Sequence, residues 1–123
     1  GKVLLAYLPE ARRQAVLRAA ALDALTPHTI TDRSQLAAEL DRVRRRGWAE
    51  AVNEREVGVA SIAAPVRDIS GEVVAAISIG VPLARCSVMA LRRLAPVIME
   101  AAEAASRRLG WSGDLSSQQR KEG

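Results

Sequence analysis

The chain has 123 residues, a formal net charge of +4 and an apolar fraction of 49%, which suits one domain with a hydrophobic core but not two. Its single cysteine excludes an internal disulfide, and its single histidine excludes a histidine-rich metal site. No apolar run approaches the ~20 residues that a membrane-spanning helix needs. The arginine clusters are expected on solvated helix faces, where basic side chains near a helix C-terminus complement its dipole.

The first part of the chain predicts two helices. Residues 1–8 have the apolar content of the end of a buried helix, and because the chain begins there without methionine we interpret it as part of a longer protein. Pro9 opens a second helix that is expected to reach Leu25, since proline fits the first helical turn, where its missing N–H costs nothing. The apolar positions of this second helix at helical spacing are Ala15, Val16, Ala19, Ala20 and Leu22.

A third helix and a short strand follow. Asp32 precedes the helix and Gln35 stands three residues further on, which is the spacing of a capping box with Asp as the cap. Gly47 is expected to end the helix as its C-terminal cap. Residues 48–52 then predict a strand, and the polar residues 53–58 connect this strand to the central segment of the chain.

The central segment, residues 57–82, predicts two strands joined by a tight turn. Runs of Val, Ile and Ala flank Asp68, Ser70 and Gly71, and these three residue types favour turns. The composition of the two runs is typical of strands that are covered on both faces. This hairpin is the element around which we expect the rest of the chain to fold.

The length of the turn decides which residues of the hairpin are partners. If Ile69 and Ser70 are its two central residues, Ser61 lies directly opposite Ser78, and a face of small residues forms under a covering helix. A bulge at Gly71 is the alternative, and a slip of one residue would place the two serines on opposite faces. The face of small residues consists of Ser61, Ala63, Ser78 and Gly80. The large apolar residues of the opposite, core-facing side are Ile62, Ala64, Val66, Ile77 and Ile79.

The last part of the chain predicts one long helix and a tail. Residues 87–109 carry apolar side chains at helical spacing. Pro96 lies inside this pattern, so the helix is expected to bend there or to start a second time. Gly110 is expected to end the helix, and residues 111–123 form a polar tail that we expect to be disordered.

Three kinds of function remain open from the residues alone. The face that carries Ser61 and Ser78 could bind a polar or anionic small molecule, or its small residues could simply make room for a packed helix. A small hydrolase or transferase would need Ser61 or Cys86 as nucleophile, with His28 as the one histidine that could act as base. A purely structural dimerisation module is the third alternative, and it predicts that side chains fill the hollow.

Several blocks of residues occur in a specific order and spacing. They are Gly1-Lys2 with Leu4, Leu5, Ala6 and Leu8; Leu25-Thr26-Pro27-His28-Thr29-Ile30-Thr31-Asp32; Leu36, Glu39-Leu40, Val43-Arg44 and Gly47-Trp48; Asn53-Glu54, Gly58-Val59 and Ile62-Ala63-Ala64-Pro65-Val66; and Gly71, Val74-Ala75-Ala76-Ile77-Ser78 and Pro82. With these blocks the chain resembles the C-terminal effector-binding domain of IclR-type bacterial transcriptional regulators, from residue 1 to about residue 110.

The resemblance implies an α/β (α+β) fold of the GAF-like type, in which helices flank an antiparallel sheet, with the first strands missing from this chain. It implies a cytoplasmic domain that binds a small organic acid effector, needs no cofactor or metal, has no catalytic residues and assembles into a homo-dimer or tetramer. DNA would be read by an N-terminal winged helix-turn-helix that this chain lacks. The expected domain organisation is a partial effector-binding domain at 1–110, followed by the tail at 111–123.

Carried over by position, the effector contacts of the family correspond to Ser61, Ser78 and Gly80, and Val59 lines the same pocket. Two departures stand out. Ala51 and Val52 occupy places where the family often has an acidic residue, and Gly80-Val81-Pro82 replaces a frequent Ser-Gly-Pro. Fewer polar groups imply a less polar effector or weaker binding.

Overall fold

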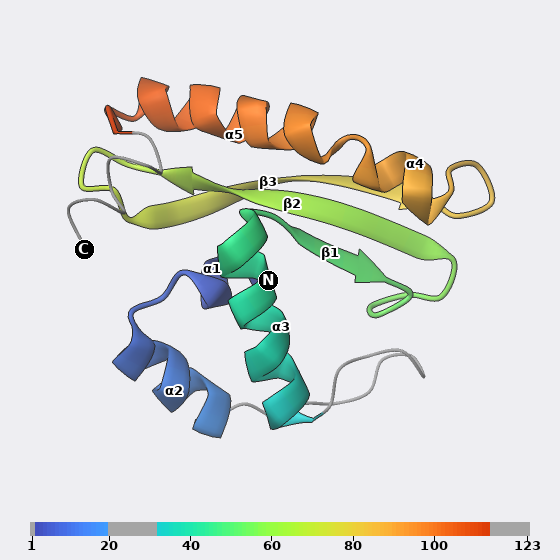
Figure 1. The fold of residues 1–123 in the computed structure, drawn as a ribbon, viewed down its shortest axis with the longest axis horizontal. Helices are drawn as coiled ribbons and strands as arrows, with labels where there is room; N and C mark the ends of the chain where they lie inside the picture. The colour runs from blue at the N-terminus through green and yellow to red at the C-terminus, as the bar shows by residue number, and fades with distance from the viewer. Residues whose placement is uncertain (1, 20–31, 114–123) are drawn as a thin grey trace.

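The computed structural model describes residues 2–19 and 32–113 as an antiparallel sheet between two layers of helices (Figure 1). The strand order is β1-β2-β3. Helices α4 and α5 cover one face of the sheet, and α1, α2 and α3 lie on the other side. The elements are α1 (Lys2–Ala6), α2 (Glu10–Ala19), α3 (Arg33–Arg46), β1 (Ala49–Val52), β2 (Val59–Arg67), β3 (Val73–Pro82), α4 (Val88–Arg92) and α5 (Ala95–Arg108).

The predicted helix ends are confirmed where the structure describes them. The Asp32 side chain accepts a hydrogen bond from the Gln35 backbone N–H at 3.1 Å and so caps α3. Gly47 ends α3 at φ 87°, in the left-handed region that glycine adopts without strain. Pro96 marks a second helix start rather than a bend, because α4 ends at Arg92 and α5 begins at Ala95.

The prediction for the buried side of α2 is wrong. Val16, assigned to the apolar stripe, is 42% exposed, whereas Arg13 and Leu17 are the buried positions of the helix. The Arg13 guanidinium donates to the carbonyl of Ala6 at 3.2 Å, at the end of α1. Packing of the long Arg13 and Leu17 side chains therefore outweighs burial of the small alanines, which would remove little apolar area from water. Residues 20–31, which include the expected end of this helix and His28, lie outside the described residues.

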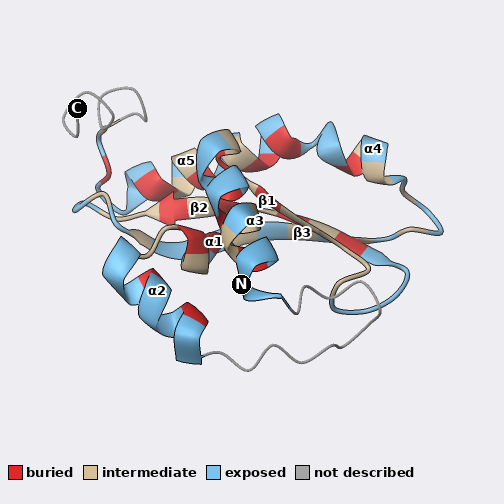
Figure 2. Cartoon of the chain, turned by 60° about the horizontal axis from the view of Figure 1, so that its bottom comes forward, coloured by how far each residue is buried: buried red, intermediate tan, exposed pale blue. Residues whose placement is uncertain are grey.

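The sheet divides the core into two clusters, and buried positions concentrate along β2 and on the inner sides of the long helices (Figure 2). The cluster on the α1–α3 side consists of Val3, Ala6, Leu17, Leu36, Leu40, Val43 and Ala49. The cluster on the α4–α5 side consists of Ala60, Ile62, Ala64, Val66, Leu91, Ile98 and Ala102. Strand β2 contributes its even-numbered residues to the second cluster, as the alternation of side chains predicts.

The predicted partners across the hairpin are wrong by two residues. Ser61 lies opposite Gly80, and Ser78 lies opposite Ala63. The turn is longer than two residues because the Asp68 carboxylate accepts the Ser70 backbone N–H at 2.9 Å, and a bulge between Val66 and Arg67 adds a further irregularity. A shift of two residues preserves the period of the strand, so both serines still lie on one face.

The end of α5 continues into a packed segment. Trp111, at which the expected tail begins, is only 7% exposed, and its backbone N–H donates to the carbonyl of Ser106 at 3.0 Å. Residues 114–123 lie outside the described part of the chain. Among the described helices, none combines the length and the apolar character needed to cross a bilayer.

Candidate functional site

The four candidate effector contacts lie on one face of the sheet. Val59 and Ser61 belong to β2, and Ser78 and Gly80 belong to β3. Ser61 and Gly80 are direct partners, so their side-chain positions point the same way, and alternation along each strand brings Val59 and Ser78 to the same side. The predicted shared face is therefore confirmed, whereas the direct pairing of the two serines is not.

This face is more open than the expected hollow under a covering helix. Ser78 and Gly80 are exposed, Ser61 is half-buried, and Val59 is 37% exposed. Further along the same face, Ala63 and Val73 pack against the cluster formed by α1, α2 and α3. The described helices thus cover one end of the face and leave the end with the two serines accessible.

The backbone of β3 adds hydrogen-bonding groups at this site. The Leu83 N–H donates to the Gly58 carbonyl at 2.8 Å, so the odd-numbered residues of this segment direct their backbone groups toward β2. Ser78 and Gly80, which are even-numbered, direct theirs to the opposite edge, where no described strand pairs with β3. The site therefore offers hydroxyl groups on the face and backbone N–H and C=O groups along the adjacent edge.

Charged side chains fix the other edge of the sheet, at β1. The Lys2 ammonium donates to the Glu50 carbonyl at 2.5 Å and to the Glu54 carboxylate at 2.9 Å. The Glu50 carboxylate receives two hydrogen bonds from Arg92, at 2.7 and 2.8 Å. Because Lys2 belongs to α1 and Arg92 to α4, Glu50 joins the helical layers on the two sides of the sheet.

These contacts shift the titration of Glu50. The hydrogen bonds from Arg92 lower the pKa of Glu50 against the opposing effect of partial burial. The charges of Arg92, Arg46 and Lys2 lower this pKa as well.

At the other end of α1, burial raises the pKa of Tyr7. The Arg67 guanidinium lies over the Tyr7 ring at 5.1 Å from its centroid, and its charge partly offsets that shift.

The comparison with protein families decides the identity of the domain. The family model described as "Bacterial transcriptional regulator IclR C-terminal" matches residues 1–107, which is nearly the whole described part of the chain. The chain belongs to the IclR family. Its fold, with helices around an antiparallel sheet, is that of IclR C-terminal domains.

Relatives of known role are transcriptional regulators. The HTH-type transcriptional regulator BhcR of Paracoccus denitrificans is 37% identical over 83% of this chain. The crystal structure of the C-terminal domain of KdgR from E. coli has a TM-score of 0.81 and 34% identity, and the match covers 89% of this chain and 67% of that one. A double mutant of the PobR inducer-binding domain from Acinetobacter, in complex with 3-hydroxybenzoic acid, has a TM-score of 0.80 at 30% identity, over 85% of this chain and 61% of that one. The chain spans only 37% of the length of BhcR.

Because the chain belongs to the IclR family, it is placed among transcriptional regulators and not among enzymes. Cys86, a candidate nucleophile, is half-buried and free. His28, the candidate base, lies outside the described residues. Within residues 2–19 and 32–113, no three His, Cys, Asp or Glu side chains gather in a way that could hold a metal ion.

The reasoning from sequence missed the ionic contacts around Glu50. Lys2 and Glu50 are separated by 48 positions, and Glu50 and Arg92 by 42. No local motif links positions that are this far apart, and lysine, glutamate and arginine are all common residue types on protein surfaces. A family of related sequences in which Glu50 and Arg92 changed together would have been the only signal.

Proposed function

We propose that this domain senses a small organic acid for a DNA-binding regulator and that Ser61, Ser78 and Gly80 bind the acid, with Val59 lining the site. The observation that carries the proposal is that all four residues share one accessible face of the sheet. The hydroxyl groups and the backbone N–H groups at the edge of β3 are donors, and a carboxylate is an acceptor that such donors stabilise.

The class of acid follows from the composition of the face. Alanine and glycine neighbours leave space and few polar groups, so the proposed effector combines a carboxylate with an apolar body. The double mutant of the PobR inducer-binding domain, which has the same fold, was crystallised in complex with 3-hydroxybenzoic acid. This compound has the proposed chemistry and is therefore a reasonable first probe for the present chain.

The proposed signalling depends on differential affinity. An effector changes the activity of a regulator only if it binds one arrangement of the protein more tightly than the other. We propose that the domain works in the cytoplasm, in a homo-dimer or tetramer, and that DNA is bound by a winged helix-turn-helix outside residues 1–123. We further propose that strands outside these residues pair with the open edge of β3, which is supported by the additional chain in the KdgR domain.

The test is a calorimetric titration of the full regulator with a panel of small carboxylic acids that includes 3-hydroxybenzoate. Ser61→Leu fills the face with a bulky side chain and is expected to weaken binding by roughly tenfold or more, the equivalent of one lost charge-assisted hydrogen bond. The matched control is Ser34→Leu, an exposed position of α3, which should leave binding unchanged. Equal affinity of the wild type and Ser61→Leu would rule out this face as the effector site.

A further inference from the structure

The connection between β1 and β2, residues 53–58, folds into a loop that is closed at its base. The Asn53 N–H donates to the Val59 carbonyl at 3.0 Å, and the Asn53 side-chain oxygen accepts the Gly58 N–H at 2.7 Å. Asn53 lies at φ 58°, in the left-handed region that asparagine tolerates better than most residues, and Gly58 lies at φ 87°. Because these hydrogen bonds join the two ends of the loop, we expect it to move as one unit.

One side of this loop is attached to the candidate effector site. Val59 follows the loop directly and pairs with Pro82 of β3. The Gly58 carbonyl accepts the Leu83 N–H at 2.8 Å, at the end of β3 that carries Gly80. A ligand that packs on Val59 and Gly80 therefore restrains the two strand ends to which the loop is joined.

The other side of the loop is attached to α1 by an ion pair. The Lys2 ammonium donates to the Glu54 carboxylate at 2.9 Å and to the Glu50 carbonyl at 2.5 Å, and it lies 3.9 Å from the Glu39 carboxylate. The side chains of Lys2 and Glu54 are 16% and 22% exposed, so water screens their attraction less than at an open surface. A lysine in the first turn of a helix gains nothing from the helix dipole. The position of Lys2 is therefore explained by these acceptors and not by the stability of α1 alone.

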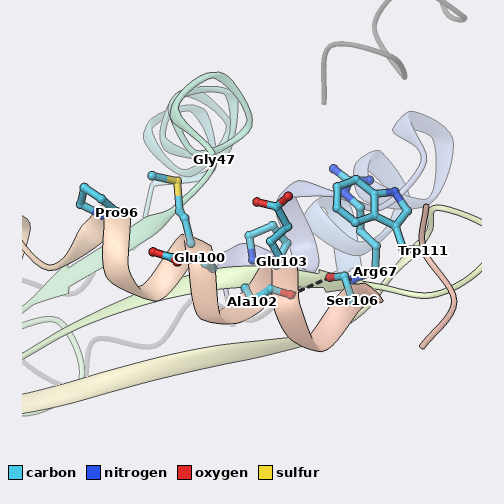
Figure 3. Close-up of a pocket in the computed structure, with 11 residues that line it drawn as sticks. Gly47, Arg67, Pro96, Glu100, Ala102, Glu103, Ser106 and Trp111 are labelled. Carbon is cyan, nitrogen blue, oxygen red and sulfur yellow. Dashed lines mark hydrogen bonds between the residues drawn. The ribbon is translucent and has the colours of Figure 1, made fainter. Parts of the chain in front are cut away.

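This attachment is separate from the groove of about 380 Å³ that α3 and α5 leave beside Pro65 (Figure 3). The groove lies toward the end of β2, whereas the loop precedes that strand. On the α5 wall of the groove, the Ser106 hydroxyl donates to the Ala102 carbonyl at 2.7 Å. Lys2 and the residues of the loop, all of which the structure describes, do not line the groove. Glu103, which lines it, is therefore a control position remote from the loop.

We propose that the loop transmits occupancy of the effector site to α1 and that the ion pair between Glu54 and Lys2 is the link. A bound ligand holds Val59 in place and so reduces the motion of the loop, and the ion pair extends this restraint to the first turn of α1. The proposed winged helix-turn-helix precedes α1 in the chain, so α1 is the described helix closest to it in sequence. The inference rests on the proposed function, because Val59 and Gly80 are proposed contacts of the effector.

The link itself is tested without a ligand, by hydrogen exchange of backbone amides in the full regulator. Lys2→Met keeps an apolar side chain but removes the charge, and it should speed exchange of the Gly58 amide about threefold to tenfold. Glu54→Gln should speed exchange of the Tyr7 amide by a similar factor, since this N–H donates to the Val3 carbonyl of α1 at 3.3 Å and depends on how firmly the helix is held.

Two control variants separate this effect from a general change of charge. Glu56→Gln is an exposed position of the same loop, and Glu103→Gln changes the groove. Neither variant should alter the exchange of the Gly58 and Tyr7 amides. Exchange of the Gly58 amide at the wild-type rate in Lys2→Met would overturn the inference.

A second experiment adds the panel of small carboxylic acids that includes 3-hydroxybenzoate. An acid that binds should slow exchange of the Tyr7 amide about threefold in the wild type. In Glu54→Gln the same acid should bind with an affinity within about threefold of the wild type by calorimetry, but the Tyr7 amide should no longer respond to it. A response of this amide in Glu54→Gln that equals the wild-type response would refute transmission through the ion pair.

Failure of the proposed function gives a different result. If no acid of the panel binds the wild type, or if Ser61→Leu binds it equally tightly, the effector site is wrong. The inference then falls with it, even where Lys2→Met shows that the loop and α1 are joined. If an acid binds the wild type and not Ser61→Leu while Glu54→Gln responds as the wild type does, the effector site stands and only the inference is overturned.

Discussion

Removal of the Ser106 hydroxyl tests how this protein protects the edge of β2. Ser106 is 2% exposed, and its hydroxyl is the acceptor for the Arg67 N–H, at the edge of β2 that lies beyond the first residue of β1, Ala49. In Ser106→Ala the Ala102 carbonyl keeps its place in the helical ladder, whereas the Arg67 N–H loses its acceptor. The variant therefore isolates one backbone donor at a sheet edge.

The expected magnitude follows from the burial of that donor. A fully buried N–H without a partner costs about 1–3 kcal/mol, and because Arg67 is half-buried we expect the lower part of this range, about 1–2 kcal/mol. Alanine has a higher helix propensity than serine, which returns roughly 0.5 kcal/mol. The net loss of unfolding free energy is about 1 kcal/mol, which corresponds to a decrease in Tm of roughly 4 °C.

Two measurements check this prediction. Urea denaturation gives the unfolding free energy, and hydrogen exchange followed by NMR gives the protection of the Arg67 amide, which should fall about fivefold to tenfold. Ser112→Ala, an exposed position, is the control and should change neither quantity. If the Arg67 amide exchanges at the wild-type rate in Ser106→Ala, the hydroxyl does not shield this edge and the argument is refuted.

Two further predictions concern the core and the ionic contact between the layers. Leu40→Ala removes a side chain with 0% exposure and should lower the unfolding free energy by about 2–5 kcal/mol in a urea titration. The control Val16→Ala, at 42% exposure, should lower it by less than about 0.5 kcal/mol in the same titration. Similar losses in both variants would contradict the described packing of α3. Because Arg92 lowers the pKa of Glu50 below its usual value of 4.5, Glu50 stabilises the fold above that pH, and this stabilisation is lost as the pH falls through the lower pKa of the folded state. The wild type should therefore lose more stability than Glu50→Gln on acidification below about pH 4.5, and parallel pH profiles of the two proteins would count against the contact.

The shared face of the candidate site could be predicted because it depends only on the period of a strand. Ser61 and Ser78 keep their common face under any shift of an even number of residues. The caps at Asp32 and Gly47 could be predicted for a similar reason, since each acts within a few residues of the chain. The partner of each serine could not be predicted, because it depends on the length of the turn, in which the Ser70 N–H donates to the Asp68 carboxylate.

The family, the two caps of α3 and the parity of the hairpin could be predicted from the amino-acid sequence, because they depend on residues that are close together or on a repeated pattern. The packing of the elements was needed to establish which parts of the serine face are covered, how Glu50 joins Lys2 to Arg92, and where α3 and α5 leave a groove beside Pro65. These features arise between residues that are far apart in the chain, such as Lys2 and Glu50 at 48 positions and Glu50 and Arg92 at 42. Their approach depends on the packing of whole elements and leaves no signature in local composition.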